Sequence, residues 1–350
     1  MGSGTTLLRL MLDSHPHIAI PPETGFMRTY DAHRFQPFKH SGKDWTKRLG
    51  WSRSELDALL AAHFDTLFRR YAEQHGKRRW GEKTPLHTWH VDDMARLFPD
   101  ARFVALVRHP SATLRSNMAR FRNRLGRAGT HWKRYTAEIA RQADRHPDRF
   151  AVLRYEELVT RPEPVLRELL AWLGEPWSDE VLSHHDVQAL RGTPLKVEGR
   201  SRADDPVDVS RVDRWVSELE PPVKRWIAER LTRQAEFLGY AMEEPLPVAP
   251  LAPEGRLLAT GQDIAARIEA FPDLDVRTRG IVPAPDRLYN PRELIVLPRE
   301  EFEHATRRRG VRALGVRVVS RWSEERRRTA QKVVHRTRAA FGLRRRPRRL

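Results

Sequence analysis

The sequence predicts an α/β protein in which a mostly parallel sheet is flanked by helices. Apolar runs of strand length alternate with helical patterns from residue 4 to about residue 175. Two of these runs, residues 101–110 and 149–158, are almost continuously apolar, as expected for parallel strands covered on both faces. Ligands of such sheets bind at the carboxyl ends of the strands, where we therefore expect the functional residues.

The first elements are expected in this order. A short helix over residues 4–14 begins in a Gly-Ser-Gly-Thr-Thr turn, and a strand over residues 17–20 ends at a Pro-Pro pair. In residues 54–73 apolar side chains recur with i, i+3, i+4 spacing, which predicts a helix. Residues 78–85 are predicted as a strand that leads into a turn, and a helix over about residues 86–98 follows.

The later elements repeat the same alternation. The strand at 101–110 leads into a helix that begins near Pro110, because proline is favoured in the first turn of a helix. The strand at 149–158 precedes a helix over residues 163–174, which Gly174 closes.

We predict four segments along the chain. Residues 1–243 form the main domain, and residues 244–253 are rich in proline and predicted as a linker. Residues 254–315 are an extension without assigned function, and residues 316–350 are predicted as a basic helix and tail. The C-terminal extension is thus expected to be mostly helical and basic.

The charge is unevenly distributed. The net charge is +18, and the last 50 residues carry 17 Lys+Arg against 4 Asp+Glu. This tail suits an anionic membrane or an acidic partner. Binding to nucleic acid is less favoured, because the tail lacks interleaved aromatic residues and base-reading motifs.

The chain contains no cysteine, which excludes disulfides, thiolate metal sites and a cysteine nucleophile. No apolar run approaches the roughly 18 residues of a membrane span, and Arg9 and Asp13 interrupt the first apolar stretch, unlike a signal peptide. These features favour a cytoplasmic protein.

The turn at residues 2–6 has the features of a phosphate cradle. Consecutive backbone N–H groups at a turn that opens a helix form an anion site, and glycine lets a phosphate approach the backbone. No lysine follows the glycine as in G-x-x-x-x-G-K-[ST], which disfavours ATP with magnesium and a P-loop kinase. Taken alone, the turn is more often an ordinary N-capped helix start than an anion site.

A second candidate anion site lies in "VRHPSATLRS". Arg108 ends a predicted buried strand, and Ser116 lies about two turns into the next helix. A guanidinium and a hydroxyl so placed can hold a second phosphate. The alternative is a structural arginine at a strand end.

Five stretches in order resemble the sulfotransferases that use 3'-phosphoadenosine 5'-phosphosulfate (PAPS), in particular the branch with tyrosylprotein sulfotransferases and related bacterial enzymes. The stretches are "GSGTTLLRLMLDSHP", "IPPET", "WGEKTP", "VRHPSATLRSNMAR" and "LRYEELV". The resemblance covers residues 2–175 and extends to about residue 242. It implies the sulfotransferase fold and sulfuryl transfer to a hydroxyl of a carbohydrate, lipid or small metabolite, without a metal.

By position, the resemblance implies a nucleotide site. The residues that would hold the 5'-phosphosulfate are Ser3, Gly4, Thr5 and Thr6. Arg108 and Ser116 would hold the 3'-phosphate, and Arg120 and Tyr155 match further positions that contact the nucleotide. Residues 211–215, "RVDRW", resemble the late segment that closes over the nucleotide.

The resemblance also implies two catalytic residues. Glu23 matches the proposed general base, and Lys83 matches the lysine that stabilises the transferring sulfuryl group. Sulfuryl transfer to a hydroxyl needs a base and cations, which suits these side chains. The alternatives are that Glu23 only caps a turn and that Lys83 pairs with Glu82 on a solvated turn.

The chain departs from the family at its start. Gly2 stands where the family has arginine or lysine, and no strand precedes the cradle. We expect a misplaced start or the truncation of a longer protein; a strand and cradle encoded directly upstream would support misplacement, and a stop codon there would contradict it. A nucleotide-binding protein without catalysis is the resulting alternative.

The remaining candidates are assigned more modest roles. His15 and His109 are expected in packing or at the polar surface, and the pair His184 and His185 beside Asp186 is expected at the surface rather than at a metal. The acceptor pocket is expected from residues 27–51, the helical insertion that follows them, and residues 190–215. Its aromatic and basic candidates, which equally suit a packed cap, are Phe35, Phe38, Lys39 and Trp45.

Overall fold

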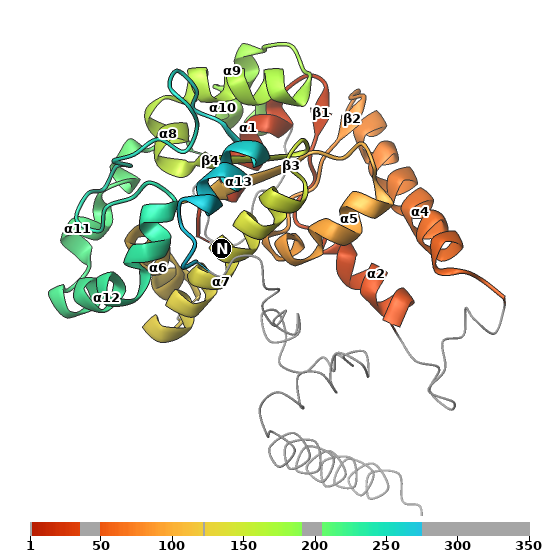
Figure 1. Ribbon diagram of the computed structural model, residues 1–350. Coiled ribbons are helices and arrows are strands. Elements are labelled where there is room, and N and C mark those ends of the chain that lie inside the picture. The colour runs from red at the N-terminus through yellow and green to blue at the C-terminus, as the bar shows by residue number, and fades with distance from the viewer. Residues whose placement is uncertain (1, 36–49, 122, 191–204, 275–350) are drawn as a thin grey trace, which may run out of the picture. The chain divides into compact units, whose positions relative to one another are not determined.

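The structure is a computed structural model. It describes residues 2–35, 50–121, 123–190 and 205–274, shown as the coloured ribbon in Figure 1. Several expectations fall outside these residues: the basic helix and tail at 316–350, residues 275–315 of the extension, and the acceptor candidates Phe38, Lys39 and Trp45.

Up to about residue 175 the elements follow the predicted alternation, with two additional helices, residues 26–35 and 125–145, that the sequence did not indicate. The first half of the chain contains α1 (Thr5–Ser14), β1 (Ile18–Ala19), α2 (Phe26–Phe35), α4 (Arg53–Gln74), β2 (Arg79–Trp80), the 3-10 helix η1 (Pro85–His90), α5 (Val91–Leu97), β3 (Phe103–Val107), α6 (Pro110–Phe121) and α7 (Leu125–Arg145). The second half contains β4 (Phe150–Arg154), α8 (Tyr155–Thr160), α9 (Pro162–Leu173), the 3-10 helix η2 (Asp179–Val181), α10 (His184–Leu190), the 3-10 helix η4 (Val209–Arg211), α11 (Arg214–Glu218), α12 (Pro221–Phe237), β5 (Ala259–Thr260) and α13 (Gly261–Glu269).

The strands of the described residues form two small sheets. β1 pairs with β2 in parallel, and β3 pairs with β4 in parallel, with Phe103 opposite Phe150. β5, which the sequence did not indicate, adds an antiparallel strand to the free edge of β4. The parallel pairing is as predicted, whereas the single sheet that was expected is divided between β2 and β3.

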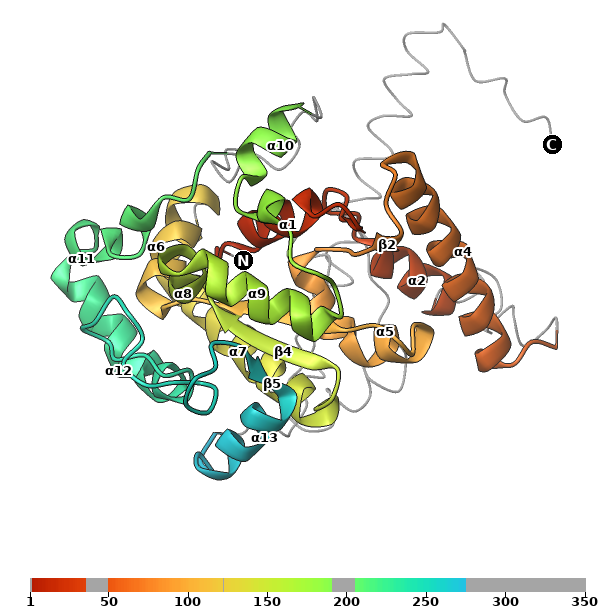
Figure 2. The same cartoon turned by 90° about the horizontal axis from the view of Figure 1, so that it is seen from above.

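Helices cover both faces of the sheet β3-β4-β5. Leu106 and Leu153 face a cluster with α1, α8 and α9, whereas Val107 and Val152 face a cluster with α6, α7, α12 and α13. Figure 1 shows α8 and α9 on one side of β4 and α7 on the other, and Figure 2 shows α9 lying along β4. This layering explains the continuous apolar runs of the two strands.

Polar groups anchor the buried helix α1. Asp13 accepts a hydrogen bond from the backbone N–H of Ile20 at 2.8 Å and another from the amide of Gln188 at 3.0 Å. Arg9 donates to the carbonyl oxygen of Ile20 at 3.1 Å. Because these groups are buried, each needs its partner, and α1 is fixed against β1 and α10.

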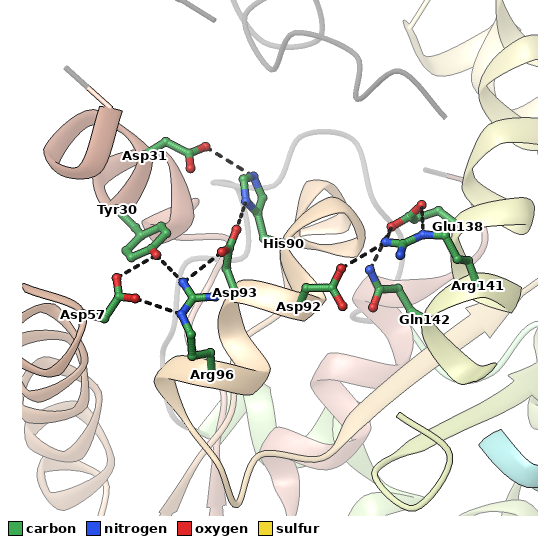
Figure 3. A network of polar contacts seen from close by, with 10 residues as sticks. All are labelled: Tyr30, Asp31, Asp57, His90, Asp92, Asp93, Arg96, Glu138, Arg141 and Gln142. Atoms are coloured by element: carbon green, nitrogen blue, oxygen red, sulfur yellow. Dashed lines mark hydrogen bonds and ion pairs between the residues drawn. The ribbon is translucent and has the colours of Figure 1, made fainter. Parts of the chain in front are cut away.

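A polar network ties the helical cap, formed by α2 and α4, to α5 and thence to α7 (Figure 3). Arg96 of α5 donates to Asp57 of α4 at 2.8 Å and to the Tyr30 hydroxyl of α2 at 2.6 Å. On the opposite side of α5, Arg141 of α7 reaches Asp92 at 3.3 Å. The cap is therefore positioned by α5, which follows the turn that carries Lys83.

Two predicted element bounds are wrong. The expected strand at 149–158 ends at Arg154, and Tyr155 begins α8, because Glu156 and Glu157 favour the positive end of a helix and Arg154 pairs with Glu157 at 2.7 Å. The helix expected over 86–98 begins as the 3-10 turn η1 and becomes α-helical only at Val91.

The proline-rich stretch at 244–253 packs against the main body. Leu251 and Ala252 are buried, and the carbonyl oxygen of Ala249 accepts from Arg154 at 2.6 Å. Farther on, Glu168 accepts hydrogen bonds from the N–H groups of Leu257 and Leu258. The proposed domain boundaries themselves stay predictions. None of the helices that the structure describes combines the length and hydrophobicity that a membrane crossing needs.

Candidate functional site

The cradle is formed by the turn that opens α1. Gly4 precedes the helix with φ +91°, in the left-handed region, and a Cβ atom there would lie 2.3 Å from the ring of Tyr155. The first helical hydrogen bond joins the N–H of Leu8 to the carbonyl of Gly4, so the preceding N–H groups lack partners within the helix. No side chain caps this end and no acidic residue lies in its first turn, which suits an anion.

Arg108 borders the cradle on one side. It follows β3 directly, and its guanidinium donates to the carbonyl oxygens of Gly2 at 3.3 Å and Arg211 at 2.6 Å. The guanidinium lies 4.1 Å from the ring centroid of Tyr155. Its Nε is buried without a hydrogen-bond partner among the described residues, so one donor of a buried cation is still available.

Buried residues around His109 fix the backbone after Arg108, and two of them, Glu156 and Tyr240, were not indicated by the sequence. The ring of His109 stacks on Trp215 at 4.6 Å, and burial lowers the pKa of His109 to about 4. Glu156 is fully buried and accepts hydrogen bonds from the N–H of His109 at 3.0 Å and the Tyr240 hydroxyl at 2.7 Å. Burial raises the pKa of Glu156. The "RVDRW" segment thus contacts Arg108 through the carbonyl oxygen of Arg211, and it contacts His109 through the ring of Trp215.

Lys83 and Glu23 meet on the other side of the cradle. The Nζ of Lys83 lies 2.5 Å from Oε1 of Glu23 and 3.4 Å from the hydroxyl of Thr6. Glu23 comes from the loop after β1, and Lys83 from the turn after β2, so the parallel pair delivers both to the start of α1. The two predicted catalytic residues are therefore brought together beside the cradle.

Glu82 has a different role from the one considered for it. It accepts hydrogen bonds from the hydroxyls of Thr84 at 2.6 Å and Thr24 at 2.9 Å, and it pairs with His87 at 2.6 Å. Burial alone would raise the pKa of Glu82, but these hydrogen bonds and the charge of His87 hold it below its ordinary value. Glu82 thus ties the loop of Glu23 to the turn of Lys83 and is not the partner of Lys83.

The remaining predicted positions, Ser116 and Arg120, lie on α6. Ser116 lies beside Gly2, its Cβ 3.5 Å from where a Cβ of residue 2 would be. Arg120 lies one turn farther along α6 and is exposed. Among the residues that sequence reasoning missed, Tyr135 of α7 lines the cavity beside the cradle, and burial raises its pKa to about 12.

The histidine predictions are partly wrong. His15 and His109 are buried packing residues as expected. His184, expected at the surface, is fully buried because α10 packs on α1; His185 is partly exposed.

One described group of potential metal ligands lies elsewhere, where His15, His17 and Glu175 place ligand atoms within 4.8 Å of one another. The His15 ring already faces the carbonyl of Pro176 and the N–H of His17. Burial would raise the pKa of Glu175, but Arg78, His17 and Arg79 lower it to about 2. These contacts connect the end of α1 to the chain after α9 and describe a structural cluster.

A model of the Sulfotransferase family matches residues 2–179, about half of the chain. The chain belongs to the sulfotransferase family. The matched segment contains both sides of the cradle, and the expected family and α/β class are thereby confirmed.

Individual relatives of this sulfotransferase are distant. It is 28% identical over 242 residues to protein-tyrosine sulfotransferase 1 of Danio rerio, covering 65% of this chain and 66% of that protein. It is 28% identical over 252 residues to protein-tyrosine sulfotransferase of Drosophila melanogaster, covering 68% of this chain and 50% of that protein. The chain therefore spans between half and about two thirds of the length of these relatives.

Among solved structures, the sulfotransferase domain of the Synechococcus PCC 7002 olefin synthase is similar, with a TM-score of 0.45 and 24% identity over 65% of this chain and 90% of that domain. The sulfotransferase domain from the curacin biosynthetic pathway gives a TM-score of 0.44 and 20% identity over 66% of this chain and 94% of that domain.

Proposed function

We propose that this sulfotransferase moves the sulfuryl group of PAPS to a hydroxyl of an acceptor. The observation that carries the proposal is the contact of Lys83 with both Glu23 and Thr6. A cation and a carboxylate meet at the first turn of a helix whose N–H groups suit an anion. Family membership supplies the reaction class.

The described residues fit the nucleotide. The backbone at Ser3 to Thr6 would hold the 5'-phosphosulfate, and Arg108 and Ser116 the 3'-phosphate. The buried Nε of Arg108 offers the donor that this phosphate needs. Tyr155 packs under the guanidinium and limits its movement. Arg120 is proposed only as a peripheral contact, because it is exposed.

The chain's own groups have complementary tasks in the reaction. The acceptor oxygen forms a bond to sulfur while the bond from sulfur to the 5'-phosphate oxygen breaks, and the acceptor proton passes to the carboxylate of Glu23. Lys83 neutralises charge that develops on the departing oxygen. Since Gly2 carries no side chain, Lys83 is the cation that we assign to this task.

For the acceptor we propose more than one class of hydroxyl compound. A carbohydrate, a lipid or a small metabolite remains our prediction, and the relatives named protein-tyrosine sulfotransferases add a tyrosine hydroxyl as a second candidate. A cytoplasmic location and the attraction of residues 316–350 to an anionic membrane or acidic partner are likewise proposals.

Nucleotide selectivity tests the proposal most directly. We expect 3',5'-adenosine bisphosphate to raise the melting temperature, and 5'-AMP and ATP with magnesium to have little effect. At 100 times the Kd, a ligand stabilises the folded state by about 2.7 kcal/mol. Equal shifts with all three nucleotides would contradict a site for the 3'-phosphate. Selective binding without transfer to any acceptor, in a screen that includes tyrosine peptides, would favour the non-catalytic alternative.

A further inference from the structure

A carboxylate–imidazole pair, Glu82 and His87, adjoins the pair formed by Glu23 and Lys83. The Oε2 atom of Glu82 lies 2.6 Å from Nδ1 of His87. The side chains of Glu82 and His87 are only 5% and 9% exposed, whereas that of Glu23 is 32% exposed. We call Glu82 and His87 the inner pair, because it is withdrawn from solvent while Glu23 stays accessible to an acceptor.

The two carboxylate oxygens of Glu82 bind different partners. Oε2 faces the imidazole of His87. Oε1 accepts hydrogen bonds from the backbone N–H of Thr24 at 3.2 Å, from the hydroxyl of Thr24 at 2.9 Å and from the hydroxyl of Thr84 at 2.6 Å. Thr24 directly follows Glu23, and Thr84 directly follows Lys83. A single oxygen atom therefore holds the neighbours of both members of the outer pair.

Further contacts fix the loop that carries Glu23. The backbone N–H of Gly25 donates to the hydroxyl of Thr84 at 3.2 Å, and the N–H of Phe26 faces the hydroxyl of Thr24 at 3.4 Å. The ring of His87 packs edge-on against the ring of Phe26, with 4.9 Å between the centroids. Three successive residues of this loop are thus tied to the inner pair, directly or through a threonine hydroxyl.

The buried position of the inner pair favours a role in positioning over a role in stability. Removing a carboxylate and an imidazole from water costs about as much as their attraction returns, so apolar side chains of similar volume often serve stability equally well. Hydrogen bonds to a charged oxygen are short and directional. The bonds at Glu82 keep its carboxylate ionised despite burial, because they lower its pKa. The inner pair is therefore suited to fixing the places of its neighbours.

We propose that Glu82, itself held by His87, is a positioning residue that keeps the carboxylate of Glu23 and the ammonium of Lys83 in register with Thr6 of the cradle. The inference rests on the proposed function and adds to it two residues that act through the outer pair. Misplacing a reacting group by about 1 Å can slow a reaction about 10²-fold. Loss of the Oε1 contacts should therefore slow transfer without weakening the nucleotide site.

Two changes at the inner pair test the proposal. Glu82→Leu combined with His87→Leu removes the pair without leaving one partner buried alone, and Glu82→Gln keeps an oxygen for both threonines. With an acceptor that the parent protein uses, we expect the double variant to lower kcat about 10²-fold. The KM for PAPS and the melting temperature should stay close to the parent values. Glu82→Gln should remain within about tenfold of the parent rate, and Glu229→Leu, at an exposed site of α12, should change nothing.

Combination with changes of the outer pair separates positioning from a general structural effect. Because Glu82 acts through Glu23 and Lys83, the double variant should lose less rate when it is made in Glu23→Gln or in Lys83→Met than when it is made in the parent. An equal loss in all three backgrounds would overturn the proposal. A full kcat in the double variant would overturn it as well, and so would equal losses in the double variant and in Glu82→Gln.

A milder variant covers the case in which the double variant does not fold. Thr84→Val removes the hydroxyl between Gly25 and Glu82 with little change in size, and it should lower kcat about tenfold for the loss of one hydrogen bond to a charged group. Thr66→Val, which removes a hydroxyl from the exposed face of α4, is the matched control. Equal rates for these two variants would overturn the proposal.

Acetylation of Lys83 tests the position of the outer pair without any transfer. The rate is followed by mass spectrometry relative to Lys133, which is exposed on α7. Loss of the inner pair should free Lys83 from Glu23 and speed its acetylation about tenfold, as for one lost charged hydrogen bond. Unchanged labelling would overturn the positioning role. Faster labelling beside a parent protein that sulfates no acceptor would support positioning and contradict the proposed function.

Discussion

The two sides of the cradle are built differently. On the side of Arg108, the guanidinium is buried, stacked on Tyr155 and held by two backbone carbonyls. On the side of Lys83, the side chain of Glu23 is 32% exposed and that of Lys83 is 13% exposed. A rigid buried cation suits binding, whereas a partly exposed carboxylate suits a group that must meet an incoming acceptor and exchange a proton.

We therefore expect changes on the two sides of the cradle to affect different quantities, the rate of transfer on one side and the affinity for the nucleotide on the other. Changes on the Lys83 side should slow transfer while nucleotide binding and stability persist. Changes on the Arg108 side should weaken binding or the fold itself, because the same buried contacts serve both.

The largest effect is expected from Glu23→Gln, which removes the proposed base but keeps the size of the side chain. Transfer should slow by about 10²–10⁴-fold, while the Kd for 3',5'-adenosine bisphosphate stays unchanged. Steady-state transfer and calorimetric binding measure the two quantities. The control is Glu163→Gln, an exposed residue of α9 that pairs with Arg167. Retention of the full rate would assign Glu23 a role in the turn only.

A slightly smaller loss is expected from Lys83→Met, which removes the cation beside Thr6. We expect a loss of about 10²–10³ in the transfer rate, as for the removal of one preorganised donor. Lys133→Met, at an exposed position of α7, is the matched control. If both variants transferred at the same rate, Lys83 would not act on the sulfuryl group.

On the binding side, Arg108→Lys keeps the charge but loses the planar fork that reaches two carbonyls and an anion. Affinity for the bisphosphate should fall by about 10–100-fold, from the loss of about 1.5–3 kcal/mol in charged hydrogen bonds, and affinity for 5'-AMP should change little. Arg115→Lys, on α6 in a pair with Glu218, should leave both affinities intact. Equal losses for both nucleotides would place the 3'-phosphate elsewhere.

Gly4→Ala and Gly174→Ala separate backbone strain from close packing. Both glycines have positive φ, +91° and +78°, but only at Gly4 would a Cβ meet another group, the ring of Tyr155. Each substitution should cost about 1–2 kcal/mol of unfolding free energy in strain, and Gly4→Ala should cost about 1–3 kcal/mol more for the overlap. Urea unfolding measures both values, and similar losses would mean that Tyr155 moves away freely.

The last prediction concerns the dependence of stability on pH. Burial lowers the pKa of His109 to about 4, so the unfolded chain takes up a proton at this residue more readily than the folded one. The contribution of His109 is complete above pH 6.5 and is lost as the pH falls from 6.5 toward 4, at about 1.4 kcal/mol per unit. His109→Gln should flatten the stability profile in this range, whereas His75→Gln, at an exposed site, should not. Parallel profiles for the two variants would exclude burial of a neutral His109.

Local patterns predicted most elements of the first 175 residues, although not the helices α2 and α7, and they did not predict which strands pair. The runs at 101–110 and 149–158 are similar in composition, yet β4 is completely buried while Phe103 and Val104 are partly exposed. Strand pairing depends on segments far away in the sequence, which a local pattern does not contain. The strand predicted at 149–158 also extended too far toward the C-terminus. Residues 155–158, "YEEL", were assigned to the strand because of Tyr155 and Leu158, whereas the two glutamates favour the start of a helix.

The residues of the candidate site were likewise predicted only where local motifs identify them. The order of motifs led to Glu23 and Lys83, and the structure places them in contact. The sequence suggested Glu82 only as an ion-pair partner of Lys83. Its contacts with Thr24 and His87 depend on the folded positions of two loops, which a local pattern does not contain. His184 was expected at the surface for the same reason, since its burial depends on α1, about 170 residues earlier.

The contacts that anchor α1 also affect the order in which the protein folds during its synthesis. His15 contacts the carbonyl of Pro176, and Asp13 contacts Gln188, at separations of 161 and 175 residues. A ribosome adds about 5–20 residues per second, so α1 exists for roughly 10–35 s before these partners are synthesised. During that interval the surface of α1 that η2 and α10 cover in the folded protein lacks those partners. The turn at the start of α1 is therefore synthesised early, and the contacts that fix its helix form only after Gln188 has been added. The yield of folded protein in the cell then depends on how the nascent chain is protected during that interval.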